Sequence, residues 1–141
     1  MKKSLPLLLI ILISFALFSC NSKSNTQNAE IDLGTSSKFS EEEIQNSINK
    51  VIEKFSTFEN CELTKLWYEE QLSIRNSGLY LSNGKGANNG STIENTIVIF
   101  SEFKTDSKAG GAWTTNTNYY WNWTLIREDN ESEWVVDDYG Y

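Results

Sequence analysis

Histidine is absent from this chain of 141 residues, and cysteine occurs only twice, at Cys20 and Cys61. Without histidine, the chain cannot form the Ser-His or Cys-His pairs that activate nucleophiles, and it lacks the most frequent general base and a usual zinc ligand. Acid–base chemistry would have to rest on carboxylates without a histidine partner. The composition therefore favours a protein that is not an enzyme, and we expect neither a cofactor nor a bound metal.

Positive charge is also scarce in this sequence. The chain holds 12 lysines and arginines against 19 aspartates and glutamates, which gives a net charge of −7. Nucleic acids are bound mainly through basic surfaces, so this balance argues against a nucleic-acid partner. An acidic surface would suit a cationic partner, although surface acidity also serves solubility alone.

The longest apolar run covers residues 5–18 and is too short for a spanning helix, which takes about 20 residues. Two lysines precede the run, and the letters "LFSC" close it at Cys20. A charged start, an apolar run and a small residue at the border are typical of a secretory signal peptide. The ending resembles the lipobox of bacterial lipoproteins, which implies that residues 1–19 are removed and that Cys20 carries the lipid. The alternative is an ordinary signal peptide followed by a chance cysteine.

The lipobox reading places the protein on the extracytoplasmic side of the cell membrane, with the bilayer as a partner through Cys20. Two or three acyl chains on one cysteine meet the two-signal requirement for stable anchoring. Removal of residues 1–19 takes away two lysines, so 10 positive groups remain against 19 negative ones, a net charge of −9. Cys61 is then left without a disulfide partner, and we expect it to be a buried thiol.

Residues 20–37 hold few large apolar side chains and show no periodicity. Such a composition predicts a flexible, lipid-anchored tether. A single folded domain is then expected over residues 38–141.

A helix is predicted to begin directly after Ser40. Ser40 and Glu43 have the spacing of a capping box, and three glutamates at 41–43 suit the positive end of a helix dipole. The following apolar residues recur at helical spacing and form one stripe, namely Ile44, Ile48, Val51, Ile52 and Phe55.

The rest of the domain has the composition of a sheet. Residues 60–74, "NCELTKLWYEEQLSI", fit either a second helix or a strand, and we favour the strand. Residues 76–91 are rich in glycine and are predicted to form turns and loops. Residues 92–105 fit a strand buried at its centre, and residues 119–141 fit a hairpin around the turn "DNES". This order predicts an α+β domain, with one helix packed on a curved antiparallel sheet of about four strands.

Four segments of the chain together carry a resemblance to a known family. They are "FENCELTKLWYEE", "IENTIVIFSEFKTD", "YYWNWTLIRE" and "WVVDDYGY". Over residues 39–141 the chain resembles an uncharacterised family of Gram-positive lipoproteins, the domain of unknown function 4829. That resemblance implies a nuclear transport factor 2-like or cystatin-like cone, in which a curved sheet wraps on helices. It implies no activity, because function depends on the site and not on the fold.

Aromatic residues offer the first candidate site. Tyr119, Trp121 and Trp123 alternate onto one face of the predicted strand. They would form either a platform for stacking sugars or the core against the helix. We favour the core, and we predict that at least one of the two tryptophans packs on the helix.

Carboxylates offer the second candidate site, since Glu102, Asp106, Asp137 and Asp138 lie on or beside the predicted sheet. Asp137 and Asp138 are adjacent and would point to opposite faces of a strand, so they do not form a catalytic pair. Any pocket of the cone is expected to open at the end of the helix, with a rim of Trp67, Tyr68, Asp138 and Tyr139.

We therefore expect a membrane-anchored lipoprotein with a non-enzymatic ligand-binding or protein-interaction domain, whose partner is an unidentified protein or small molecule. One alternative is a small hydrolase or isomerase that uses a buried carboxylate in the cone pocket. Another is a lipoprotein that blocks or accompanies a partner encoded nearby.

Overall fold

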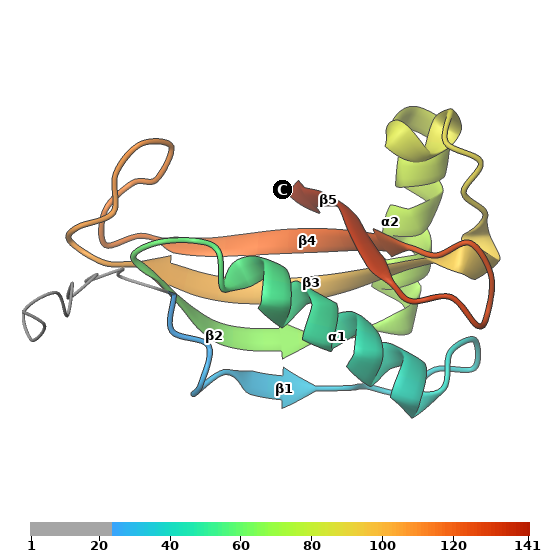
Figure 1. Cartoon of the computed structure of the whole chain (residues 1–141), viewed down its shortest axis with the longest axis horizontal. Helices are drawn as coiled ribbons and strands as arrows, with labels where there is room; N and C mark the ends of the chain where they lie inside the picture. Colours follow the sequence, from blue (N-terminus) through green and yellow to red (C-terminus); the bar gives the residue numbers. More distant parts are fainter. Residues whose placement is uncertain (1–23) are drawn as a thin grey trace, which may run out of the picture.

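A five-stranded sheet, in the order β1-β2-β3-β4-β5, forms the centre of the molecule (Figure 1). The structure is a computed structural model, and it describes residues 24–141; the expected signal peptide and Cys20 lie outside these residues. β1 pairs with β2 in parallel, and all other neighbours are antiparallel. The strands are β1 (Glu30–Asp32), β2 (Cys61–Trp67), β3 (Thr96–Thr105), β4 (Asn118–Ile126) and β5 (Val135–Gly140).

Helix α1 (Glu41–Phe55) crosses one face of this sheet, and helix α2 (Glu70–Asn83) lies behind it (Figure 1). Two short 3-10 turns, η1 (Lys85–Ala87) and η2 (Ile93–Asn95), connect α2 to β3. The α+β class and the hairpin around "DNES" are confirmed, and the strand favoured within residues 60–74 is present as β2, which ends at Trp67. The strand count is corrected from about four to five, because a strand precedes the first helix. The sheet is also mixed and not wholly antiparallel as predicted, because this first strand, β1, pairs with β2 in parallel.

The capping box predicted at the start of α1 is present. Glu43 N donates to the Ser40 hydroxyl at 3.2 Å, and Ser40 N donates to the Glu43 carboxylate at 2.7 Å. The apolar stripe of α1 is buried against the sheet, together with side chains from β2, β3 and β4. These side chains fill the space between helix and sheet.

The prediction that a tryptophan packs on the helix is confirmed by Trp123. Its side chain is fully buried, and its ring centre lies 6.4 Å from that of Phe55 at the end of α1. The indole nitrogen donates to the Ser101 hydroxyl at 2.8 Å, so the buried polar atom is satisfied.

Helix α2 corrects two predictions. It begins within residues 60–74, where a strand was favoured over a second helix, and its second half replaces part of the loop predicted over residues 76–91. The helix turns small polar side chains, Ser73 and Ser77, toward the sheet, and both are buried. The Ser73 hydroxyl accepts the Val98 backbone N–H at 2.9 Å. An apolar stripe is therefore not needed on this helix, and its absence from the sequence concealed the element.

Residues 24–37 also differ from the flexible tether expected there. Asn25 N donates to the Cys61 carbonyl and Leu63 N donates to the Asn25 carbonyl, each at 2.9 Å. β1 then pairs with β2, and Ser37 donates to the Glu70 carboxylate at the start of α2. Backbone pairing along the edge of β2 holds this segment, although its side chains are mostly polar.

Candidate functional site

The four residues expected to form one pocket rim lie in different places. Tyr68 is buried in the core, and its hydroxyl lies 3.2 Å from that of Ser36. Trp67 points to the opposite face of the sheet and stacks on Phe100, with ring centres 5.8 Å apart. Only Asp138 and Tyr139 line the same hollow, so the expected rim is not assembled.

An aromatic cluster instead occupies the sheet beyond the end of α1. Trp121 stacks on Tyr139 at 5.6 Å and lies 6.3 Å from Tyr141, measured between ring centres. Trp113, from the loop between β3 and β4, lies 5.3 Å from Trp121. Tyr139 and Tyr141 keep 42% and 88% of their surface exposed, so the cluster is open to solvent on one side.

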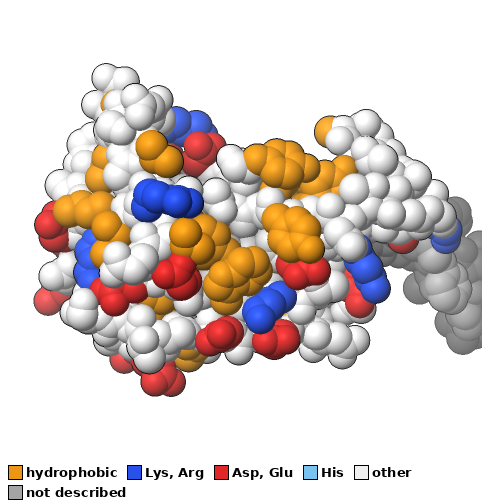
Figure 2. All heavy atoms as spheres, turned by 180° about the vertical axis from the view of Figure 1, so that it is seen from behind, with side chains coloured by type: hydrophobic (Ala, Val, Ile, Leu, Met, Phe, Trp, Pro, Cys, Tyr) orange, Lys and Arg blue, Asp and Glu red, His pale blue; other side chains and the backbone are white. Residues whose placement is uncertain are grey.

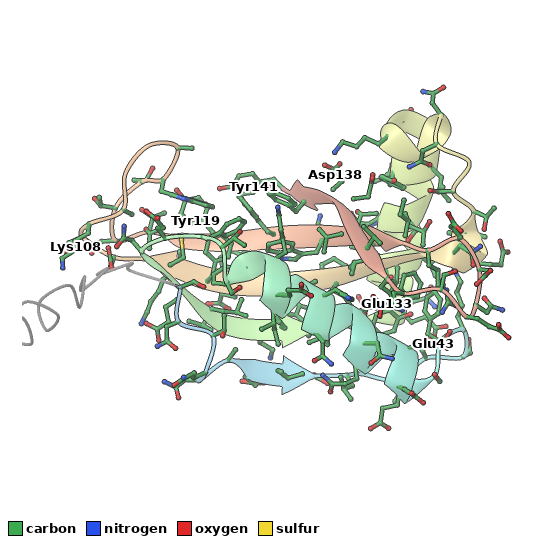
Figure 3. The ribbon with its side chains drawn as sticks, viewed as in Figure 1. Glu43, Lys108, Tyr119, Glu133, Asp138 and Tyr141 are labelled. Carbon is green, nitrogen blue, oxygen red and sulfur yellow. The ribbon has the colours of Figure 1, made fainter. Side chains whose placement is uncertain are left out.

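Trp113 also holds its own loop in place. Its ring lies 5.3 Å from Tyr119 and 5.5 Å from Phe58. The Tyr119 hydroxyl accepts the backbone N–H of Thr114 at 2.9 Å. Figure 3 shows Tyr119 and Tyr141 close together between this loop and the end of β5. The loop and the C-terminal strand thus frame one end of β4.

β4 is longer than its partner β5, and this difference leaves part of its edge open. Pairing with β5 begins at Asn122, opposite Gly140. In the described part of the chain, residues 118–121 of β4 therefore have a neighbouring strand, β3, on one side only. Gly140 has a φ of 148°, a conformation that favours glycine, and the ring of Tyr141 after it lies beside Trp121, with ring centres 6.3 Å apart.

The open edge carries an exposed aromatic side chain on its other face as well. Tyr120 is 59% exposed and points away from α1. Figure 2 shows apolar side chains gathered over the middle of this face, beside the end of α2. We call the open edge and its aromatic flanks the β4 edge site; it consists of residues 118–121 with Trp113, Tyr139 and Tyr141.

The opposite edge of the sheet is built differently. β1 is three residues long, and two of them are the acids Glu30 and Asp32. Short strands and charges on an edge are common devices against unwanted pairing. Residues 118–121, "NYYW", hold no charge at all. The β4 edge site therefore lacks the protection that β1 has.

The chemistry of the β4 edge site is that of binding. Unpaired strand groups can donate and accept backbone hydrogen bonds, and aromatic faces bind apolar groups and cations. Lys54 already lies over the ring of Tyr139, with its nitrogen 5.7 Å from the ring centre. None of the residues that define the site has a carboxylate side chain for acid–base work.

The carboxylates of β5 lie near α2. The Tyr80 hydroxyl donates to Asp137 at 2.7 Å and accepts from the Asn89 amide at the same distance. Burial, and then the bond to Asp137, raise the pKa of Tyr80. Asp138 pairs with Lys85 at 3.4 Å and lines a shallow hollow of about 240 Å³. Ligand pockets usually hold about 300–1,000 Å³, so this hollow is small.

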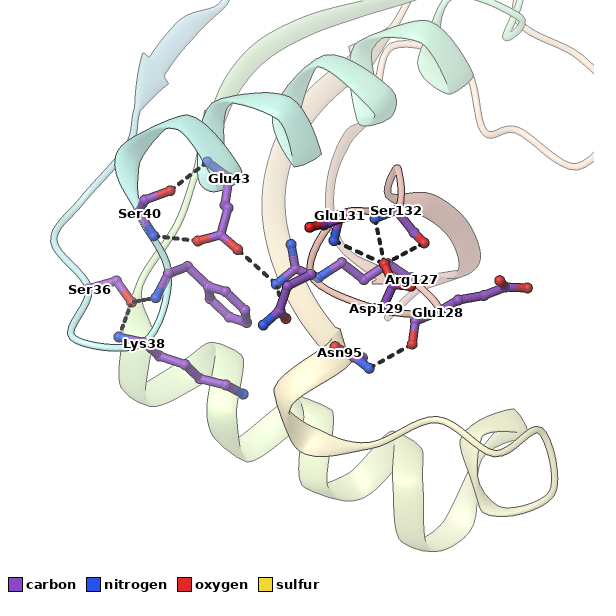
Figure 4. A network of polar contacts seen from close by, with 12 residues as sticks. Ser36, Lys38, Ser40, Glu43, Asn95, Arg127, Glu128, Asp129, Glu131 and Ser132 are labelled. Carbon is purple, nitrogen blue, oxygen red and sulfur yellow. Dashed lines mark hydrogen bonds and ion pairs between the residues drawn. The ribbon is translucent and has the colours of Figure 1, made fainter.

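A second polar network joins the start of α1 to the β4–β5 turn (Figure 4). Arg127 pairs with Glu43 at 2.7 Å, and its guanidinium lies 4.2 Å from the centre of the Trp134 ring. Asp129 accepts hydrogen bonds from the backbone of Glu131 and Ser132, each at 2.9 Å. These contacts connect neighbouring elements of the fold, so we interpret the network as structural.

Metal ligands do not gather within residues 24–141, where no group of three or more suitable side chains was found. Cys61 is buried, as expected, and burial followed by the charge of Asp106 raises the pKa of its thiol to about 11. A thiol with this pKa is a poor nucleophile at neutral pH. In the part of the chain that the structure describes, no helix is long and apolar enough to cross a membrane.

The alternation predicts the correct face of the sheet for Trp121 but assigns Trp121 to the core, whereas it is only partly buried. The roles of Trp113, Tyr120 and Tyr141 were not predicted. No pattern in the side chains marks the unpaired part of β4, because it depends on where the pairing with β5 stops.

Comparison with protein families gives one match. The family model described as a domain of unknown function (DUF4829) matches residues 36–140. No curated protein and no solved structure matches this chain.

Proposed function

Starting from the fact that the chain belongs to the DUF4829 family, we propose that it is a membrane-anchored lipoprotein whose domain binds another protein at the β4 edge site. The anchor is Cys20, and the domain faces the extracytoplasmic side. The partner contributes an extended segment that adds to the sheet as a further strand. The protein is not an enzyme.

The open edge of β4 is the observation that carries this proposal. Four residues without a second neighbour span roughly 13 Å, which is room for a segment of about four residues. Main-chain hydrogen bonds supply affinity in strand addition, and alternate side chains supply specificity. At the β4 edge site, side chains of the bound segment would meet Tyr120 on one face of the sheet and Trp121 with Tyr141 on the other face.

The aromatic flanks and the charge of the chain define the partner segment. Aromatic faces favour apolar side chains, lysine and arginine. The chain without residues 1–19 has a net charge of −9, from 10 positive and 19 negative groups, which favours a basic segment. The partner is therefore an extended segment with apolar or basic residues at alternate positions.

Selection of linear peptides displayed on phage tests this binding mode. Bound peptides should share apolar or basic residues at alternate positions, and Tyr120→Ser should weaken the binding of a selected peptide about tenfold, equivalent to about 1.4 kcal/mol. Leu79→Ser is the matched control, because Leu79 on α2 is 56% exposed and Tyr120 is 59% exposed. Equal binding by both variants would contradict the proposal.

A second candidate function, a small hydrolase or isomerase, has one observation in its favour: the contact between Tyr80 and Asp137. However, the Tyr80 hydroxyl and the Asp137 carboxylate are hydrogen-bonded to each other, and the hollow beside them is shallow. Both observations weigh against this function. Asp137→Asn would abolish activity toward a panel of ester substrates if this function were present.

For the fold, we propose membership of the nuclear transport factor 2-like group. Support comes from the placement of α1 across one face of a sheet whose strands extend beyond the end of the helix (Figure 1).

A further inference from the structure

The N-terminal segment is fixed to one end of the domain. Ser24 N donates to the Phe58 carbonyl at 3.1 Å, directly before the pairing of Asn25 with β2. The β3–β4 loop, residues 106–117, reaches the same place, because Asp106 N donates to the Asn60 carbonyl at 3.0 Å. We call Ser24, residues 58–60 and residues 106–117 the anchor end.

The anchor end is close to Cys20 in any conformation of the residues between them. Four steps along the chain separate Cys20 from Ser24, and they span at most about 14 Å. A free tether up to residue 37 would span roughly 60 Å instead. The opposite end of the domain lies the length of β3 away, and its 10 residues span roughly 33 Å. The short connection therefore decides which end of the domain stays near the lipid.

Charge opposes contact between the sides of the domain and an anionic bilayer. The exposed side of α1 borders a groove of about 560 Å³ that remains acidic, because five glutamates line it against two cations, Lys50 and Arg127; the glutamates are Glu42, Glu43, Glu53, Glu131 and Glu133. The β1 edge carries Glu30 and Asp32. Anionic phospholipids repel such surfaces and attract lysines close to the bilayer.

The anchor end has a different surface. Lys108 is exposed on the loop, and Figure 3 shows it at the outer limit of the domain. A hollow of about 480 Å³ opens beside it and is lined mainly by uncharged polar side chains, including Asn25, Asn60, Asn116 and Asn118, with one lysine, Lys104, and two acids, Glu62 and Asp106. Amide groups and a lysine can hydrogen-bond to phosphate and glycerol groups of lipids.

We infer that the domain stands on its anchor end, with residues 106–117 against the phospholipid head groups and the free end of α2 directed away from the membrane. The inference rests on the lipid anchor at Cys20 that is proposed above. It also places the β4 edge site next to the bilayer, since Trp113 belongs to both. A partner segment would then be bound close to the membrane surface.

Fluorescence quenching in vesicles tests this orientation. The full chain with acylated Cys20 is placed in phosphatidylcholine–phosphatidylglycerol vesicles that carry a spin label on their head groups. One variant, Ser107→Cys, bears a fluorophore on the loop, and its control, Asn88→Cys, bears it beyond α2; both positions are exposed. Cys61 is buried with a thiol pKa of about 11, so it reacts slowly with the label.

The label at position 107 should lose most of its fluorescence, and the label at position 88 should keep it. Insertion of 20 glycine and serine residues between Lys23 and Ser24 adds about 25 Å of average reach, so it should remove the difference. Equal quenching at both positions in the chain of natural length would overturn the orientation. A chain that fails to float with the vesicles would overturn the lipid anchor itself, which separates the two failures.

Discussion

Arg127 and Glu43 form an ion pair of 2.7 Å in which the arginine is almost wholly buried, with 4% of its side chain exposed. The pair joins the first turn of α1 to the end of β4, and no hydrogen-bond partner for the Arg127 Nε lies within residues 24–141. Burial disfavours the charge on Glu43, but hydrogen bonds from the Ser40 backbone and from Arg127 outweigh it and lower the pKa of Glu43 below its ordinary value of 4.5.

Glu43→Gln should therefore destabilise the domain in a way that depends on pH. Glutamine can still accept the Ser40 N–H, but Arg127 loses its counter-charge, which should cost about 1–3 kcal/mol at neutral pH. Because the pKa of Glu43 is lowered in the folded state, its stabilisation is complete above 4.5 and is lost as the pH falls through the folded-state value.

Urea unfolding at a series of pH values measures this effect. The difference in the free energy of unfolding between Glu43→Gln and the unmodified protein should disappear at acidic pH. Glu42→Gln is the control: it removes a neighbouring exposed charge in the same turn and should cost a few tenths of a kcal/mol at most, roughly the helix-dipole contribution. A difference that stays constant with pH would contradict the role given to the ion pair.

The two tryptophans of β4 should respond differently to substitution. Trp123→Ala removes a fully buried ring and should cost about 3–5 kcal/mol. Trp121→Phe should cost less than about 1 kcal/mol, because Trp121 is only partly buried and its indole N–H has no partner among the described residues. Denaturant midpoints measure both losses of stability. Equal losses would contradict the assignment of Trp123 to the core and of Trp121 to the binding surface.

Residues of the docked N-terminal segment should contribute to stability, unlike those of a free tether. Leu33 packs against the core, so Leu33→Ala should lower the melting temperature by several degrees, the effect of about 1 kcal/mol in a domain of this size. Ile31, two residues earlier, is 42% exposed, and Ile31→Ala should change the melting temperature little. Melting curves that coincide for both variants would show that the segment is not docked.

Cys20 is expected to be the first residue of the mature protein and to carry the lipid. Mass spectrometry of the mature N-terminus should find a diacylglycerol on its sulfur, and Cys20→Ser should release the protein from the membrane. Cys61→Ser is the control and should leave the protein in the membrane fraction. An unmodified Cys20, or cleavage at another residue, would end this assignment.

Local signals predicted part of the fold well. The capping box and the apolar stripe predicted α1. The alternation around Trp123 predicted the face of the sheet that contacts this helix. Helix α2 was not predicted because small polar residues, Ser73 and Ser77, lie on its buried side in place of an apolar stripe. The docking of residues 24–37 depends on backbone pairing with β2, which leaves no pattern in the side chains. The β4 edge site was hidden for a similar reason, since an unpaired edge depends on where a distant strand ends.

Amide hydrogen exchange along β4 tests most directly the claim that its open edge binds an extended segment. In the free protein, outward-facing amides of residues 118–121 should exchange faster than those of residues 122–126, which lie between two strands. A bound peptide should slow exchange at 118–121 and leave α1 unchanged. Protection that is already uniform along β4, or a bound peptide that slows exchange elsewhere and not at 118–121, would contradict the claim.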